Sequence, residues 1–199
     1  MKDGTMSSSL IRKFALAVAG ATLVLLTGCA QVKLAEPSAS IDNIQLAKSS
    51  GLAPVAVGAF VPAAGLPKSV DQSVSIRSNT FFSPYDSSFS KYLQQTLSVE
   101  LKGAGLLEST SKTVIGGQLT KSTVEAGASQ GAASLGARFN VSRDGNTVYE
   151  KELVENDNWP SSFVGAVAIP DAVNHYTALY RRLVARLFKD EAFRAAVKP

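Results

Sequence analysis

The N-terminal segment decides which residues of this chain are available to form a folded domain. Three basic residues stand within the first 13 positions, an apolar run fills residues 14–26, and two small residues follow. This order of charged, apolar and small residues predicts a signal peptide over residues 1–28. A membrane-spanning helix needs about 20 apolar residues, so the shorter run predicts a segment that is cleaved off rather than a permanent anchor. The domain must then be built from the residues that follow.

The segment ends in Leu26-Thr27-Gly28-Cys29, which resembles the lipobox of bacterial lipoproteins. The resemblance implies cleavage between Gly28 and Cys29, a diacylglyceryl group on the sulfur of Cys29, and acylation of its new amino group. Several acyl chains anchor a protein stably, because each buried CH₂ contributes roughly 0.8 kcal/mol. Ala30 stands where an aspartate would imply retention in the inner membrane, so the resemblance implies the periplasmic face of the outer membrane. The alternative is an unlipidated, buried Cys29 thiol.

Composition narrows the class of protein further. Without residues 1–28 the chain has 171 residues, enough for one domain with a core, and 17 Lys and Arg against 15 Asp and Glu. A nucleic-acid-binding protein normally shows a concentrated basic face. None is evident here, so we expect no nucleic-acid partner. Cys29 is the only cysteine, and once it is lipidated no disulfide can stabilise the domain.

Residues 29–53 show scattered apolar residues without sustained periodicity. They predict a lipidated cysteine followed by a tether, which docks partly through Ile41, Ile44 and Leu46. We therefore expect the periplasmic domain to comprise residues 54–199.

Apolar periodicity predicts the elements of that domain. In the first of two expected helices, apolar residues recur every four positions from Phe89 to Leu101. The expected elements, in chain order, are strands over 54–61 and 73–82, a helix over 84–105 that starts at Ser83-Pro84, a strand over 113–127, a hairpin over 134–156 that turns at Asp144-Gly145, and a helix over 169–193. A sheet with one apolar face needs a cover. We therefore expect an α+β fold, an antiparallel or mixed sheet covered on one face by two amphipathic helices in a two-layer sandwich.

One pattern suggests catalysis. Residues 127–131, GASQG, match the nucleophile elbow G-x-S-x-G, and Asp157 and His175 follow Ser129 in the order of α/β-hydrolases. An elbow needs a strand before the serine and a helix after it, whereas here small residues continue into a strand. We interpret the segment as a hairpin loop and expect no catalytic residue.

Other chemistry finds little support in the sequence. One histidine and no free cysteine leave mainly carboxylates as ligands, so we expect no metal site, and no cofactor motif is present. Glu150 and Glu152 lie two residues apart on an expected strand, so their side chains point to the same face. The two carboxylates of a glycosidase must likewise be able to reach one glycosidic bond. Neighbouring acids on an exposed hairpin are common, and we assign them no catalytic role.

Residues 156–170, NDNWPSSFVGAVAIP, hold the only tryptophan of the chain. Trp159 and Phe163 are candidate partner-binding residues, because aromatic side chains often carry binding energy at interfaces. The alternative is that they close one end of the core.

Several segments together resemble the YajG-like group of small proteobacterial outer-membrane lipoproteins. They are the lipobox, the helix with YLQQTLSVELKGAGLL, the strand beginning VIGGQLT, the hairpin, and the last helix with YTALYRRLVARLF. The arrangement is also similar to the lipopolysaccharide-assembly lipoprotein of the outer-membrane translocon and to lipoprotein partners of ABC transporters. The resemblance brings no catalytic residues and implies a non-enzymatic envelope protein that binds another component.

We therefore expect an outer-membrane-anchored periplasmic lipoprotein, held by the lipid on Cys29. It would act as an accessory or interaction module in envelope assembly or transport, with an envelope protein as partner. Two alternatives remain: a lipid-anchored serine hydrolase using Ser129, and a lipid-binding domain with a pocket between sheet and helices.

Overall fold

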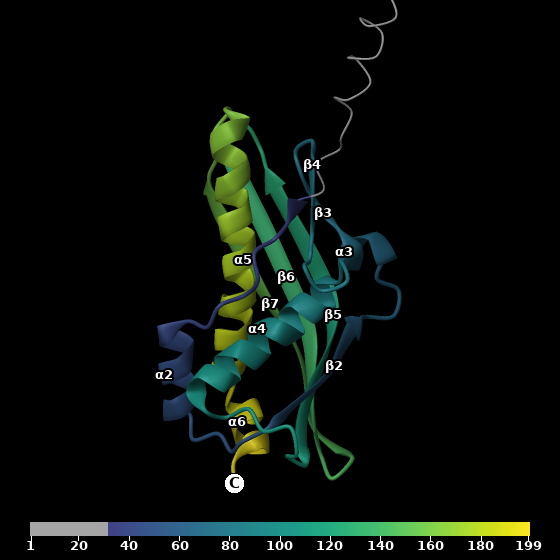
Figure 1. Ribbon diagram of the computed structural model, residues 1–199, viewed down its shortest axis with the longest axis vertical. Coiled ribbons are helices and arrows are strands. Elements are labelled where there is room, and N and C mark those ends of the chain that lie inside the picture. The colour runs from purple at the N-terminus through teal and green to yellow at the C-terminus, as the bar shows by residue number, and fades with distance from the viewer. Residues whose placement is uncertain (1–31) are drawn as a thin grey trace, which may run out of the picture. The chain divides into compact units, whose positions relative to one another are not determined.

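Long antiparallel strands form the frame of the domain, which the computed structural model describes over residues 32–199. Strands β5 (Thr113–Ala126), β6 (Gln130–Arg143) and β7 (Asn146–Pro160) are antiparallel, and β2 (Ala56–Pro62) pairs parallel with β5. The sheet order is β2-β5-β6-β7 (Figure 1). The β6–β7 turn lies at Asp144-Gly145 as predicted, and both residues have positive φ, 49° and 83°.

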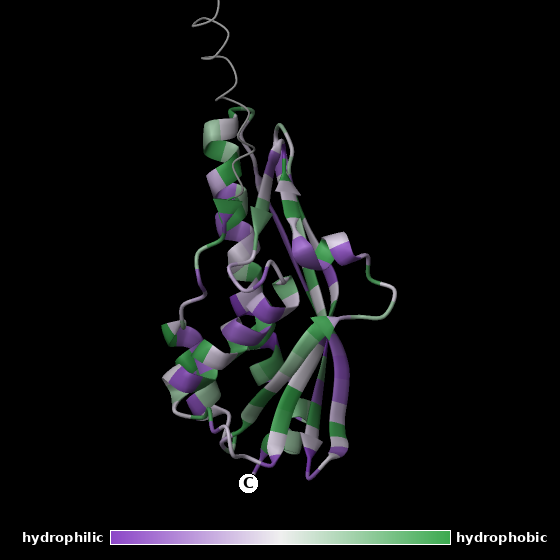
Figure 2. Ribbon diagram, turned by 45° about the vertical axis from the view of Figure 1, so that its right-hand side comes forward, coloured by the Kyte–Doolittle hydropathy of each residue, from purple (hydrophilic) through white to green (hydrophobic). Residues whose placement is uncertain are grey.

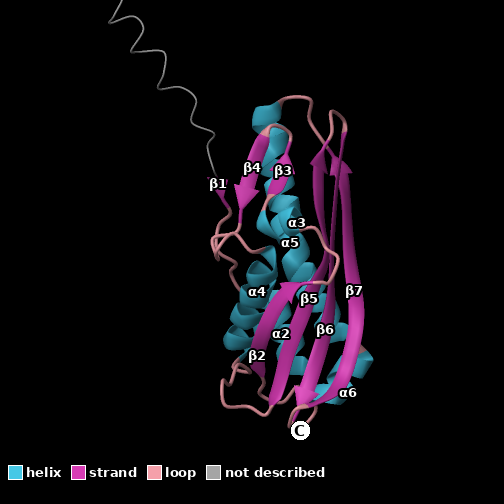
Figure 3. Cartoon of the chain, turned by 90° about the vertical axis from the view of Figure 1, so that its right-hand side faces the viewer, coloured by secondary structure: helices cyan, strands magenta, loops and turns pink. Residues whose placement is uncertain are grey.

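Two amphipathic helices cover one face of this sheet, which confirms the expected fold class. Helix α4 (Phe89–Ala104) packs on β2 and β5, and α5 (Gly165–Lys189) packs mainly on β6 and β7. Figure 3 shows both helices behind the strands. Apolar side chains of the sheet and the helices meet in the layer between them, which buries the apolar stripe of each helix.

Helix α4 starts later than predicted. Its N-cap is Ser88, whose side chain accepts a hydrogen bond from the backbone N–H of Lys91 (3.2 Å). The predicted start at Ser83-Pro84 is wrong, because Asp86 and Ser87 have positive φ values of 50° and 57° that a right-handed helix does not accommodate. Gly105 ends the helix in the left-handed conformation (φ 74°), as expected of a glycine at this position.

A second, smaller sheet of order β1-β4-β3 packs beside the upper half of β5. The predicted single strand over 73–82 is in fact a hairpin of β3 (Val74–Ile76) and β4 (Asn79–Phe82), which turns at Arg77 with φ 55°. Strand β1 (Val32–Lys33) runs parallel to β4. The short helix α3 (Lys68–Gln72) packs on β5 and α4, and the short helix α6 (Glu191–Val197) packs on α5, β6 and β7.

The expected tether is part of the folded domain from Val32 onward. Helix α2 (Ile41–Ser49) packs on α4 and α5, so residues 41–49 form a further layer over the helices. Leu34, Ala47 and Leu52 are buried. A boundary at residue 54 is therefore too late, because the preceding segment contributes core side chains.

The predictions for residues 1–31, including cleavage after Gly28 and lipid on Cys29, lie outside the described residues. Within residues 32–199, none of the helices has the length and apolar character needed to cross a membrane.

Candidate functional site

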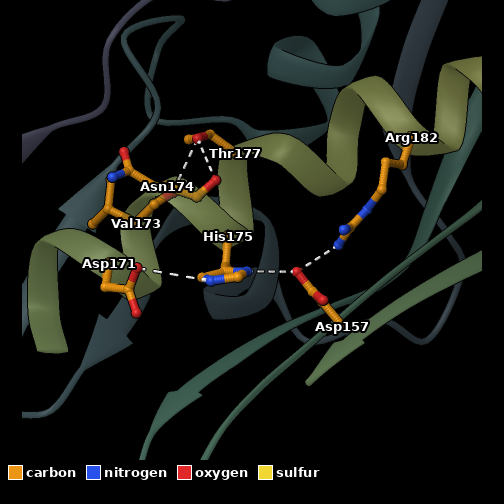
Figure 4. Close-up of polar contacts among 7 residues, drawn as sticks. All are labelled: Asp157, Asp171, Val173, Asn174, His175, Thr177 and Arg182. Carbon is orange, nitrogen blue, oxygen red and sulfur yellow. Dashed lines mark hydrogen bonds and ion pairs between the residues drawn. The ribbon is translucent and has the colours of Figure 1, made fainter. Parts of the chain in front are cut away.

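A cluster of charged residues lies between β7 and α5 (Figure 4). Asp157 comes from β7, while Asp171, His175 and Arg182 project from α5. The Oδ2 of Asp157 lies 2.8 Å from His175 Nδ1 and 2.6 Å from Arg182 Nη2. His175 Nε2 lies 3.7 Å from Asp171 Oδ1, one helical turn earlier. Asp157 thus ties the edge strand β7 to the helix that covers it.

Local surroundings favour an ionised Asp157. Burial raises the pKa of its carboxyl, but the hydrogen bonds and charges of Arg182 and His175 outweigh burial and hold the pKa below its usual range. The His175 ring stacks on the indole of Trp159, with ring centroids 4.2 Å apart and planes within 5°. The stacking and the two carboxylates fix the orientation of the imidazole.

The structure does not place Ser129 with this histidine. Residues 127–129 form the turn between β5 and β6, as predicted for a hairpin loop, and the carbonyl oxygen of Ser129 accepts a hydrogen bond from Ser161 N (2.9 Å). Within residues 32–199, no hydroxyl group hydrogen-bonds to His175, whose two ring nitrogens face Asp157 and Asp171. Of the three residues that the sequence pattern grouped, Asp157 and His175 form a pair, and Ser129 does not contact it.

The carboxylates considered as a glycosidase pair lie at the surface of the sheet. Glu150 and Glu152 are exposed on β7, and Glu152 lies 3.7 Å from Arg138 of the neighbouring strand. Among residues 32–199, no group of three or more His, Cys, Asp or Glu side chains is placed to hold a metal ion.

Aromatic rings fill the layer between the sheet and the helices. Phe89 and Tyr176 contact edge to face with ring centroids 5.7 Å apart, and Tyr92 and Tyr180 do so at 4.8 Å. Phe139 on β6 is also fully buried. These rings occupy the place where the lipid-binding alternative locates its pocket.

The two aromatic candidates for partner binding have opposite environments. Trp159 is only 4% exposed, and it packs against Gly131 on the neighbouring strand, where a Cβ would overlap the indole. It closes one end of the core, as the alternative prediction had it. Phe163, four residues later, is 83% exposed, and Val164 and Val167 beside it are more than half exposed. We call Phe163, Val164 and Val167 the apolar tip.

Arg77 holds the loop of the apolar tip in place. Its guanidinium donates hydrogen bonds to four backbone carbonyl oxygens at 2.5–3.1 Å, those of Ala126, Gly127, Ser162 and Phe163. These contacts join the β3–β4, β5–β6 and β7–α5 connections at one end of the domain. No sequence pattern predicts this role, because non-glycine residues rarely adopt the positive φ that places Arg77 in its turn.

Comparison with known proteins assigns no family. No protein-family model and no curated protein matches the chain. Among solved structures, protein XCC0632 from Xanthomonas campestris, described with family model DUF330, is similar at 13% identity and TM-score 0.43, covering 78% of this chain and 94% of that one. The hypothetical protein CT253 from Chlamydia trachomatis has 12% identity and TM-score 0.39, with 69% and 96% covered. A minor lipoprotein from Acinetobacter baumannii has 13% identity and TM-score 0.36, with 72% and 91% covered. None of the three is similar enough to assign a function to this chain.

Proposed function

We propose that the protein is an envelope lipoprotein, held at the periplasmic face of the outer membrane by lipid on Cys29. In this proposal its domain acts as a non-catalytic accessory module in envelope assembly or transport, of the YajG-like kind. The observation that carries the proposal is Leu26-Thr27-Gly28-Cys29 at the end of a signal-like segment. The structure describes the chain from Val32, three residues after Cys29. A lipid on Cys29 would therefore hold the domain close to the membrane surface.

The charged cluster supports a structural role better than a catalytic one. A catalytic histidine needs one ring nitrogen free to take a proton from a nucleophile or water. His175 instead has a carboxylate at each nitrogen and an indole against its face. Asp157 is also bound to Arg182, so the group that would orient the histidine serves an ion pair between strand and helix.

Lipid labelling in a Gram-negative host tests the anchor. We expect the wild-type protein to incorporate radiolabelled palmitate and to fractionate with the outer membrane. Cys29→Ser should lose the label and remain unprocessed. Ala30→Asp is the matched control for location, since it should keep the label but move to the inner membrane. An unlabelled wild-type protein would refute the proposal.

Crosslinking tests the accessory role. The full-length lipoprotein, crosslinked in its native envelope and purified in mild detergent, should bring down one defined envelope protein. Retention of that protein by Ser129→Ala would agree with a module. If the purified protein instead turns over an ester substrate, and Ser129→Ala abolishes turnover without unfolding, the hydrolase alternative replaces the proposal.

A further inference from the structure

One end of the domain presents an uncharged, apolar surface. Residues 158–170 include no charged residue, and Phe163, Val164 and Val167 are exposed within them. The adjoining β5–β6 turn, residues 127–129, is also uncharged. Arg77 is the nearby cation, and its guanidinium is engaged by four carbonyl oxygens. Three exposed apolar side chains within five residues make this end a candidate contact surface for another component.

The chain enters the domain from this same end. Strand β1 runs parallel to β4, with Val32 paired to Phe81, and β4 leads away from the turn at Arg77. Strand β1 therefore also runs away from the apolar tip, so Val32 is the residue of β1 closer to it (Figure 1). Three residues span at most about 11 Å. A lipid on Cys29 is thus attached to the chain within that distance of Val32.

The opposite end of the domain is charged. Lys112 and Asp144 form an ion pair at 3.4 Å beside the β6–β7 turn. Arg143 donates to the carbonyl oxygens of Ala196 and Lys198 near the C-terminus. Figure 2 shows white and green colour at the start of α5, at the top, and purple at the turns at the bottom. The charged end therefore favours water, whereas the apolar tip favours an apolar environment.

We propose that the apolar tip is a second membrane contact, in which Phe163, Val164 and Val167 lie in the interface of the leaflet that holds the lipid of Cys29. This inference rests on the proposed lipidation. Apolar side chains at an interface add to the hold of an acyl anchor, since each buries apolar area. Because Arg77 fixes the loop, the tip presents its side chains without ordering on contact. The domain then stands on this end, with its charged end in the periplasm.

A pair of valines provides a matched test. Val167 is at the tip and 58% exposed, while Val148 is near the charged end and 46% exposed. Val167→Cys and Val148→Cys are each made in the full-length lipoprotein, labelled with an environment-sensitive fluorophore, and placed in phosphatidylethanolamine–phosphatidylglycerol vesicles. Brominated acyl chains then report contact with lipid. We expect loss of fluorescence at position 167 and none at position 148. Adding Phe163→Asp to the Val167→Cys variant should reduce the loss.

The possible results separate the membrane contact of the apolar tip from the lipidation of Cys29. Unquenched label at 167, or equal quenching at 167 and 148, overturns the membrane contact; the first leaves the tip free for a protein partner. The protein without an introduced cysteine is the control. If it takes up no thiol-reactive fluorophore and its mass includes the lipid, Cys29 is lipidated, and the absence of quenching at position 167 leaves the proposed function intact. If the parent protein takes up thiol label, Cys29 is free, which overturns the proposed function and this inference together.

Discussion

Glu100 on α4 fastens the segment before residue 54 to the rest of the domain. Its fully buried carboxylate accepts hydrogen bonds from Ser40 N (2.9 Å) and from Asn43 Nδ2 (3.0 Å). Asn43 Nδ2 also donates to the carbonyl oxygen of Arg181 on α5 (2.9 Å). Glu100 therefore ties α2 to α4, while Asn43 ties α2 to α5, and replacing Glu100 should release α2 first.

The size of the effect follows from the donors left without an acceptor. Glu100→Ala removes the acceptor of the Ser40 N–H and of one Asn43 N–H, and each unsatisfied buried donor costs about 1–3 kcal/mol. Removing a buried carboxylate offsets part of this cost. We expect the free energy of unfolding to fall by about 2–4 kcal/mol. Glu100→Gln retains one acceptor oxygen, so it should cost about 1–2 kcal/mol.

The pH dependence separates this mechanism from simple packing. Burial raises the pKa of Glu100, and the hydrogen bonds from Ser40 and Asn43 and the charge of Arg181 only partly oppose it. A raised pKa in the folded state means that folding takes up a proton. The contribution of Glu100 to stability is therefore greatest at low pH and declines as pH rises through the raised pKa. Glutamine does not titrate, so the stability difference between wild type and Glu100→Gln should shrink as pH rises above about 4.

Urea denaturation followed by circular dichroism measures the free energies, and amide hydrogen exchange locates the change. Exchange in α2 should accelerate more than exchange in β6. Glu152→Ala is the control, because Glu152 is exposed on β7 and its loss should change stability by less than about 0.5 kcal/mol. A Glu100→Ala protein as stable as this control, with unchanged exchange in α2, would show that Glu100 does not hold α2 in place.

Four further substitutions test the charged cluster, the tip and the Ser129 turn. Trp159→Ala should lower the free energy of unfolding by about 3–5 kcal/mol because the indole is buried, whereas Phe163→Ser at the exposed tip should change it by less than about 0.5 kcal/mol; equal effects in thermal denaturation would contradict their assigned environments. Asp157→Asn should lower the free energy of unfolding by about 1–3 kcal/mol at pH 7, because it weakens the bond to Arg182. The pKa of Asp157 is lowered in the folded state. The difference in stability from wild type should therefore vanish as pH falls through and below that pKa. A difference that persists in acid urea titrations would argue against the ion pair. Ser129→Ala should leave stability and any ester turnover unchanged, and a loss of turnover would favour the hydrolase.

Regular periodicity made the frame of the fold predictable. Alternating apolar residues marked β6 and β7, the Asp144-Gly145 pair marked their turn, and four-residue spacing marked α4. These signals are local, so each can be read within one segment. They yielded the covered sheet, which the structure confirms.

The missed features depend on contacts between distant segments. Helix α2 buries Asn43 and Ala47, a polar and a small residue, and therefore shows no apolar stripe in the sequence. Its place depends on Glu100, 57 positions beyond Asn43. At the charged cluster, sequence order joined Asp157 and His175 correctly but supplied the wrong third residue. Arg182 completes the cluster because α5 presents it two turns after His175.

The proposed function depends on Cys29 becoming a lipidated N-terminus. Mass spectrometry of the N-terminal peptide, taken from protein purified from its native envelope, tests this most directly. We expect the peptide to start at Cys29 and to carry a diacylglyceryl group on sulfur and an acyl chain on the amino group. A mature protein that retains residues 1–28, or that starts elsewhere with a free Cys29 thiol, would contradict it.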